Sequence, residues 1–146
     1  MGDSRKVSRV VWPTVIGVTT LVIWGFSLTP AETSAQQSGF VRQLLLALLG
    51  EGALADFFLT YVPVRKLAHF TEYFVLGGEW ALYQRADRRR WLGLCGLPVA
   101  VVDECLQFFS PGRGPAVADV LLDTVGYACG FALFWLLART FCRKQK

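Results

Sequence analysis

The 146-residue sequence has few charged residues and none of the compact motifs that mark common enzyme classes. Only 18% of its residues are Asp, Glu, Lys or Arg, and its four cysteines lack the paired spacing that holds zinc. It contains no glycine-rich phosphate loop, no Ser/His/Asp elbow and no internal repeat. With the high apolar content described next, these absences exclude a disordered chain and a soluble α/β enzyme.

Hydrophobic residues are abundant instead. They make up 53% of the chain, and the mean hydropathy is +0.41. The few charges cluster between apolar runs, as in a small multi-spanning membrane protein. The net charge of +4 does not indicate a nucleic-acid partner, because the basic residues form no single stripe. We therefore expect one membrane domain over residues 1–146.

Four stretches approach the roughly 20 apolar residues that a helix needs to cross a bilayer core of about 30 Å. The expected fold is an all-α, four-helix integral membrane bundle. Arg5, Lys6 and Arg9 precede the first stretch as they would in a signal peptide, but we expect an uncleaved anchor, since its removal would put the termini on opposite sides. The predicted spans are residues 10–28, 67–83, 91–109 and 117–138.

The distribution of Lys and Arg predicts the orientation, because short cytoplasmic loops carry the excess of positive charge. With four spans, one side holds eleven of the fifteen basic residues. Both termini and the loop 84–90 are therefore expected in the cytoplasm, and the connection 29–66 and the loop 110–116 outside. The eleven are Arg5, Lys6, Arg9, Arg85, Arg88, Arg89, Arg90, Arg139, Arg143, Lys144 and Lys146.

The segment 39–62 is ambiguous. Its leucine-rich first half is helix-like, but Gly50, Glu51 and Gly52 follow. We interpret it as an interfacial or re-entrant helical segment on the outer face, between the first and second spans. A fifth span is the alternative, and it would discard the charge asymmetry of the loops.

Seven ionisable side chains fall inside the predicted spans, where each costs about 2.5–3.5 kcal/mol on insertion scales. At 1.5 Å per residue, most lie roughly 3–9 Å below the outer boundary, and only Glu79, at about 18 Å, is much deeper. We predict a polar chamber that opens outward, with Arg113 on its rim. The seven are His69, Glu72, Glu79, Asp103, Glu104, Asp119 and Asp123.

Helical spacing groups the polar residues into stripes. Gly126 and Gly130 are four residues apart, as small residues are where two membrane helices approach closely. The face that packs therefore also presents aspartates. The three stripes are Lys66, His69 and Tyr73; Asp103 and Gln107; and Asp119, Asp123, Gly126 and Gly130.

The acids of the chamber outnumber its cations, and they cannot all be ionised without partners. Either some of them keep a proton, or a hard divalent cation such as Mg²⁺ or Ca²⁺ lies among their oxygens. The sequence leaves both possibilities open. The acids are Glu72 and the four candidate metal ligands Asp103, Glu104, Asp119 and Asp123.

Several short motifs follow one another along nearly the whole chain. They are Phe26-Ser27 with Ser34 and Ser38; Arg65-Lys66-Leu67-Ala68-His69-Phe70-Thr71-Glu72-Tyr73; Asp103-Glu104 with Gln107; Pro111-Gly112-Arg113; and Asp119, Asp123, Gly126 and Gly130. In this order and at these distances, the chain resembles the VanZ-like family, the membrane family named for the teicoplanin-resistance protein VanZ. Many members carry asparagine where this chain has Asp123.

The resemblance implies a four-helix protein of the bacterial cytoplasmic membrane. Some members are associated with reduced susceptibility to teicoplanin, a lipoglycopeptide that acts at the outer membrane face. The resemblance implies no known reaction.

The first functional hypothesis is a binder of a lipid headgroup or a lipid-linked envelope precursor. Arg113 and Lys66 are the expected contacts to the phosphate, with the acids arranging a bridging cation, because a guanidinium binds phosphate at two points. A structural salt bridge from Arg113 to Asp119 is the alternative. The candidate ligand-binding residues are Lys66, Tyr73, Gln107 and Arg113.

Two other classes stay open. One is an intramembrane metal-dependent enzyme that acts on a lipid-linked phosphate or glycan, with His69 or Glu72 as general acid or base. The other is proton-linked transport, suggested by Glu79 below Glu72 on the same helix.

Overall fold

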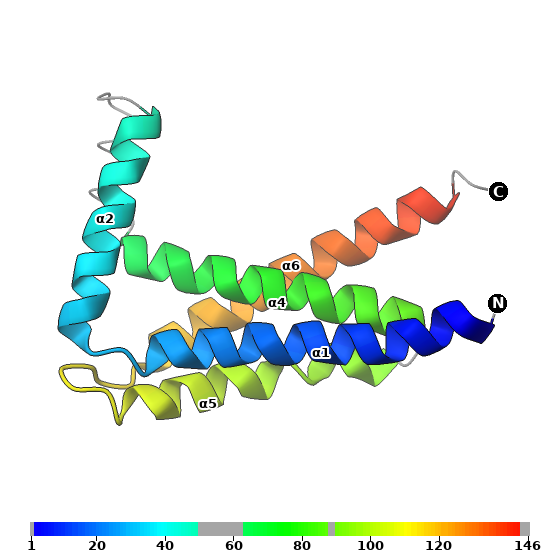
Figure 1. The fold of residues 1–146 in the computed structure, drawn as a ribbon, viewed down its shortest axis with the longest axis horizontal. Coiled ribbons are helices and arrows are strands. Elements are labelled where there is room, and N and C mark those ends of the chain that lie inside the picture. Colours follow the sequence, from blue (N-terminus) through cyan, green and yellow to red (C-terminus); the bar gives the residue numbers. More distant parts are fainter. Residues whose placement is uncertain (1, 50–62, 88–89, 144–146) are drawn as a thin grey trace.

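The computed structural model of the chain describes residues 2–49, 63–87 and 90–143, and in these ranges the only regular elements are helices. The all-α prediction is therefore confirmed for this part of the chain. Four helices run roughly along one axis, and α2 stands across one end of them (Figure 1). The elements are α1 (Gly2–Ser27), α2 (Ala31–Leu49), α4 (Val64–Asp87), the 3₁₀ helix η1 (Arg90–Leu94), α5 (Leu97–Gln107) and α6 (Val117–Arg143).

Two of the described helices are long and apolar enough to cross a membrane. The segments are Arg9–Ser27 in α1 and Val117–Thr140 in α6, and they match the first and fourth predicted spans. Helix α4 has a comparable length, 24 residues, but carries several charged side chains. Helix α5 has only 11 residues, about half of what a crossing needs. Four crossings remain a prediction.

The third predicted span, residues 91–109, is not one helix. The structure divides it into η1 and α5, which begins at Leu97 with Pro98 in its first turn. Proline suits a helix start because it has no N–H to donate. Gly96 lies directly against Tyr127, where a Cβ atom would be 2.2 Å from the ring, and the Tyr127 hydroxyl donates to the Gly93 carbonyl at 2.7 Å. These contacts with Tyr127 fix the interruption between η1 and α5.

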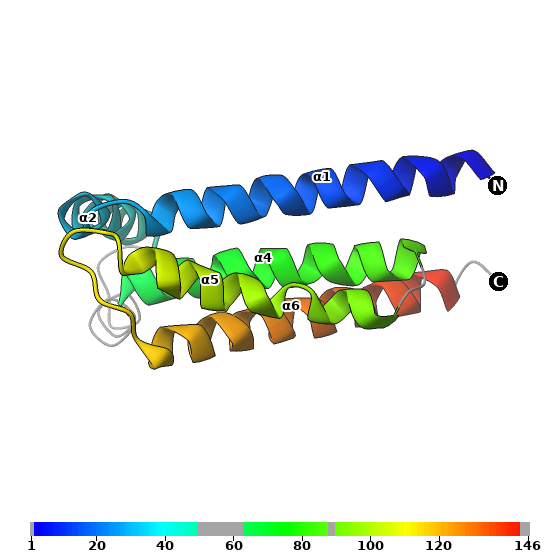
Figure 2. The same cartoon turned by 90° about the horizontal axis from the view of Figure 1, so that it is seen from below.

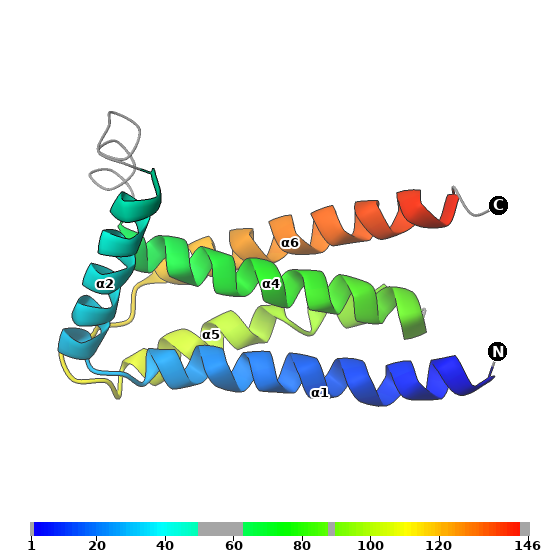
Figure 3. The same cartoon turned by 45° about the horizontal axis from the view of Figure 1, so that its top comes forward.

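The predicted outer-face segment, residues 39–62, is partly described. Its first half belongs to α2, which begins earlier than predicted, at Ala31 directly after Pro30. Residues 50–62 lie outside the described ranges. Figures 1 and 3 both show α2 running across the bundle and not along it, an arrangement that agrees with an interfacial helix better than with a fifth span for residues 31–49.

Helices α4 and α6 pack closely through glycine. A Cβ atom at Gly130 would lie 1.9 Å from the Phe74 carbonyl oxygen, and one at Gly126 would lie 2.7 Å from that of Phe70. On the opposite side of the contact, a Cβ atom at Gly77 would lie 2.1 Å from the Tyr127 carbonyl oxygen. The predicted close approach along the glycine stripe of α6 is thereby confirmed.

The outward faces of the helices are apolar, and the interior holds polar side chains. Leu21 of α1 is 66% exposed and Leu121 of α6 is 61% exposed, whereas Asp103 and Asp123 are completely buried. A soluble protein rarely exposes so much apolar surface, and hydrocarbon outside with polar groups inside is the pattern of membrane helices. The buried apolar cluster is formed by Ile16, Ile23, Tyr73, Leu76, Ala100 and Tyr127.

The start of α1 and the end of α6 lie at the same end of the bundle, as Figures 1 and 2 show. At this end Arg9 Nε lies 2.8 Å from Asp87 Oδ1, which ties the beginning of α1 to the end of α4. The opposite end carries α2 and the loop between α5 and α6 (Figure 2). This arrangement is the one that an even number of crossings requires.

Candidate functional site

Three buried polar side chains converge from three helices. His69 Nδ1 on α4 lies 3.9 Å from Asp103 Oδ2 on α5 and 3.8 Å from Asp123 Oδ1 on α6. Both aspartates are completely buried, and the His69 side chain is 12% exposed. The helices that were predicted to place polar groups at one level therefore bring these three together. We call this group the His–Asp cluster.

The polar atoms in and beside the His–Asp cluster lack partners. Both carboxylate oxygens of Asp103 and of Asp123, and Nδ1 of His69, accept or donate no hydrogen bond within the described residues. The Tyr73 hydroxyl and the Ser27 hydroxyl are equally buried and equally unpaired there. Buried polar groups are almost always satisfied, so such a concentration calls for an explanation.

The other two acids of the predicted metal set lie elsewhere. Glu104 accepts a hydrogen bond from the Ala116 N–H, just before α6. Asp119 pairs with Lys66, with 3.8 Å between Nζ and Oδ1, at a partly exposed position. Among the described residues the donor atoms that converge belong to His69, Asp103 and Asp123, and the set of four acids stays a prediction. The second carboxylate oxygen of Glu104, Oε2, is buried and has no hydrogen-bond partner within the described residues.

Arg113 binds the end of α1. Its Nη1 donates to the carbonyls of Phe26 at 3.3 Å and Ser27 at 3.2 Å, and its Nη2 donates to Thr29 Oγ1 at 3.2 Å. The last carbonyls of a helix carry partial negative charge, so a cation stabilises them. Asp119 pairs with Lys66, and no salt bridge joins it to Arg113 within the described residues.

The loop that carries Arg113 is held by backbone contacts. The Ala31 N–H donates to the Pro111 carbonyl at 3.1 Å, and Gly112 adopts a φ of 74°, which favours glycine. Burial, followed by the nearby charge of Arg65, lowers the pKa of the Arg113 guanidinium, which still keeps its proton at neutral pH.

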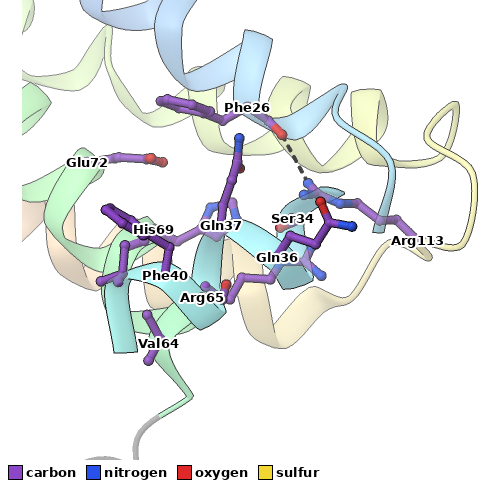
Figure 4. A pocket seen from close by; sticks show the side chains of 13 residues that line it. Phe26, Ser34, Gln36, Gln37, Phe40, Val64, Arg65, His69, Glu72 and Arg113 are labelled. Carbon is purple, nitrogen blue, oxygen red and sulfur yellow. Dashed lines mark hydrogen bonds between the residues drawn. The ribbon is translucent and has the colours of Figure 1, made fainter. Parts of the chain in front are cut away.

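A cavity of about 610 Å³ lies between α1, α2, α4 and the Arg113 loop (Figure 4). The guanidiniums of Arg65 and Arg113 both line it, with His69 and a single acid, Glu72. Amide side chains and phenylalanine rings complete the wall. The remaining lining residues are Phe26, Ser34, Gln36, Gln37, Ser38, Phe40, Val41, Val64 and Ala68.

A second, apolar cavity of about 460 Å³ continues from the first along the contact of α1 with α4. It shares Glu72, Ala68, Val64 and Val41 with the first cavity, so the two adjoin each other. The site thus has a cationic end and an apolar groove. The other residues of the groove are Thr19, Val22, Ile23, Leu67, Thr71 and Val75.

The remaining predicted ligand-binding residues lie outside this cavity. Lys66 and Asp119 line a small cleft of about 120 Å³, which shares Arg65 and His69 with the cavity. Tyr73 lies in the interior beside the His–Asp cluster, and Gln107 Oε1 accepts a hydrogen bond from Arg65 Nη2 at 2.8 Å. The predicted roles of all these residues remain predictions.

Arg65 is the main cavity residue that was not predicted as a ligand-binding residue. The signal was present in the spacing, because Arg65, His69 and Glu72 lie four and three residues apart and therefore share one helix face. The amide and hydroxyl groups of α2 were also missed, since α2 begins well before residue 39.

Glu79 lies away from the cavity and contacts α1. Its Oε1 accepts a hydrogen bond from Thr19 Oγ1 at 2.8 Å. A proton path through Glu79 stays a prediction.

Comparison with known proteins gave one finding. A family model described as VanZ/LLP1 matches residues 13–138, which cover most of the chain. No curated protein and no solved structure matches the chain.

Proposed function

The chain belongs to the VanZ/LLP1 family, and from this premise we propose that it is a bacterial membrane protein that binds a phosphate-bearing lipid. The ligand is either an ordinary lipid headgroup or a lipid-linked envelope precursor. A single observation carries the proposal: a cavity with two guanidiniums adjoins an apolar groove. An amphiphile with an anionic head and a long tail has the matching chemistry.

The head end of the cavity has an excess of positive charge. Arg65 and Arg113 line it against one acid, Glu72. Planar guanidiniums bind phosphate oxygens at two points, and such charge-assisted hydrogen bonds are strong. Arg65 is oriented by its hydrogen bond to Gln107, and Arg113 by the carbonyls at the end of α1. Both cations are therefore positioned before a ligand arrives.

The tail of the ligand has a place along α1 and α4. The groove of about 460 Å³ is lined mainly by aliphatic side chains, among them Val22, Ile23 and Val75. It starts at the cavity and runs toward the middle of both helices. A hydrocarbon chain in this groove packs against aliphatic side chains. These van der Waals contacts replace contacts that the chain and the groove would otherwise make with other lipid.

The proposed topology places this cavity at the outer leaflet. It has four crossings with both termini in the cytoplasm, supported by the charge asymmetry of the loops and by the common location of the termini (Figure 1). A protein that binds envelope precursors there would act on the face where teicoplanin acts. Reduced susceptibility to this drug is accordingly part of the proposal.

The test is a binding titration of the purified protein by native mass spectrometry. The probes are a polyprenyl phosphate, phosphatidylglycerol and the uncharged polyprenol of the same chain length. We expect both phosphates to bind at least tenfold more tightly than the polyprenol, since charge-assisted hydrogen bonds contribute about 1.5–3 kcal/mol. Equal binding of phosphate and polyprenol would contradict the proposal. Tighter binding of polyprenyl phosphate would identify the ligand as a lipid-linked precursor, and tighter binding of phosphatidylglycerol would identify it as an ordinary lipid headgroup.

A matched pair of variants locates the head. Arg65→Gln removes a cation that lines the cavity near the start of α4, and Arg85→Gln removes a cation in the last turn of the same helix, away from the cavity. The first should weaken binding of polyprenyl phosphate about tenfold, and the second should change it less than about twofold. Equal losses from both variants would show that the charge acts without a defined site.

A reaction on the bound lipid is the second candidate. One observation favours it: His69 and Glu72, the predicted acid and base, both line the cavity in which the head would lie (Figure 4). Purified protein with added Mg²⁺, Mn²⁺ or Zn²⁺ would then release phosphate from a polyprenyl diphosphate. An absence of turnover leaves binding as the function.

A further inference from the structure

We infer that His69, Asp103 and Asp123 bind one divalent transition-metal ion. Their donor atoms come from α4, α5 and α6 and all lie within 4.8 Å of one another. His69 Nδ1 is 3.9 Å from Asp103 Oδ2 and 3.8 Å from Asp123 Oδ1. Two donors that each lie about 2.1 Å from one ion are at most about 4.2 Å apart. Both separations lie below this limit, and the third, between the two carboxylates, is at most 4.8 Å.

The burial of the two aspartates requires a compensating charge or proton. Both are completely buried, and none of their four oxygens has a hydrogen-bond partner within the described residues. Two carboxylates in so small a volume repel each other when ionised, and one imidazolium would neutralise only one of them. A doubly charged cation neutralises both and satisfies the oxygens as ligands.

Two neighbouring hydroxyls give independent support. The Tyr73 hydroxyl is completely buried and has no partner within the described residues. The Ser27 hydroxyl is equally buried and lies next to Asp103. A hydroxyl near a metal ligand or a metal-bound water acquires the hydrogen bond that it lacks here. Outer-shell groups of this kind orient metal ligands in many sites.

The donor set selects the class of metal. One imidazole nitrogen with two carboxylates suits Zn²⁺, Mn²⁺, Fe²⁺ or Co²⁺. Mg²⁺ and Ca²⁺ prefer sites built from oxygen alone. The inferred ion therefore differs from the Mg²⁺ or Ca²⁺ expected from the sequence, and its ligands differ from the four acids expected there.

The site also has an open side. His69 belongs both to the His–Asp cluster and to the wall of the cavity with Arg65 and Arg113. Three protein ligands leave a coordination position for water or for a phosphate oxygen from the cavity. This last relation rests on the proposed lipid binding, whereas the metal site does not.

The test measures metal bound to the purified, detergent-solubilised full chain. The protein is first treated with a chelator and then dialysed against Zn²⁺, Mn²⁺, Co²⁺ or Mg²⁺, each alone. Elemental analysis should find one Zn²⁺, Mn²⁺ or Co²⁺ per chain, with the visible absorption of coordinated Co²⁺. Binding of Mg²⁺ alone, or of no metal, overturns the inference.

Variants with the same chemical change on the same helix provide the control. Asp123→Asn removes a proposed ligand, whereas Asp119→Asn alters an acid one turn away that pairs with Lys66. We expect Asp123→Asn to lose at least tenfold in metal affinity and Asp119→Asn to retain one ion per chain. Equal metal content in the two variants overturns the inference.

A second measurement covers the case in which Asp123→Asn folds poorly. Thermal unfolding of the wild type should shift upward when Zn²⁺ is restored to the chelated protein, because an ion that binds only the folded state stabilises it. His69→Gln should abolish this shift, and a wild-type protein that shows no shift overturns the inference.

The metal site and the proposed function can fail separately. Chelated protein that still binds polyprenyl phosphate but takes up no metal refutes the metal site alone. Metal uptake without lipid binding refutes the proposed function alone.

Discussion

Gly130 on α6 lies directly against the backbone of Phe74 on α4, so closely that a Cβ atom would be 1.9 Å from the Phe74 carbonyl oxygen. This contact and its neighbour, Gly126 against Phe70, determine how α4 and α6 are placed along each other. His69 immediately precedes Phe70, and Asp123 lies three residues before Gly126. The glycine contact therefore brings His69 to Asp123, and packing and the polar site depend on the same few residues.

Replacement of Gly130 by alanine should destabilise the protein. The added methyl group meets backbone, which cannot move aside as a side chain can, so the two helices must separate. We expect Gly130→Ala to lower the free energy of unfolding by about 1–3 kcal/mol, the usual range for overpacking. Thermal unfolding of the purified protein in detergent measures the effect.

Gly25→Ala on α1 is the matched control, because a Cβ atom there would meet nothing within 4 Å. It should leave the unfolding temperature unchanged or raise it slightly, since alanine favours helix more than glycine does. If both variants lowered the unfolding temperature equally, the close contact of α4 with α6 would not be the cause.

Loss of the pair between Lys66 and Asp119 should have little effect on stability. Their charged atoms are 3.8 Å apart, and half of the Lys66 side chain is exposed. Such pairs contribute less than about 1 kcal/mol, and salt screens them. A double-mutant cycle of Lys66→Gln and Asp119→Asn in thermal unfolding checks this. A coupling well above that value would show that the pair is structural.

The proposed topology predicts which loops reagents reach from outside the cell. With the native cysteines replaced by serine, Gly114→Cys in the loop before α6 should react with a membrane-impermeant maleimide on intact cells. A cysteine at Arg85, near the end of α4 that lies with the termini (Figure 1), should react only after lysis. The reverse pattern would invert the chain in the membrane.

The positions of the long helices and the gathering of polar side chains between them could be predicted from the sequence, because both depend on the helical period of the residues. Apolar length indicated α1 and α6, and the spacing of Asp123, Gly126 and Gly130 indicated the packed face. These inferences needed only residues on one helix, whose angular positions follow from 3.6 residues per turn.

The partners of individual charges were not predictable in the same way. Glu104 accepts a hydrogen bond from the Ala116 N–H, and Asp119 pairs with Lys66. Which partner an acid meets depends on how one helix is rotated and shifted against another. The break before α5 was missed for a related reason. The Tyr127 ring that lies against Gly96 belongs to a different helix, and no local pattern reveals it.

Arg113 and Arg65 should respond differently when each is changed to lysine. Lysine keeps the positive charge but loses the planar fork, so it cannot reproduce the three contacts of Arg113 with Phe26, Ser27 and Thr29. Arg113→Lys should therefore lower the unfolding temperature, because the end of α1 loses these contacts, and it should also weaken polyprenyl phosphate binding. Within the described residues, Arg65 makes a side-chain hydrogen bond only to Gln107. Arg65→Lys should weaken binding with a smaller change in unfolding temperature. Thermal unfolding and the lipid titration, measured on the same preparations, separate the two roles.

If Arg113→Lys unfolded at the wild-type temperature, the guanidinium would not be holding the end of α1. Other contacts would then have to fix the head end of the cavity.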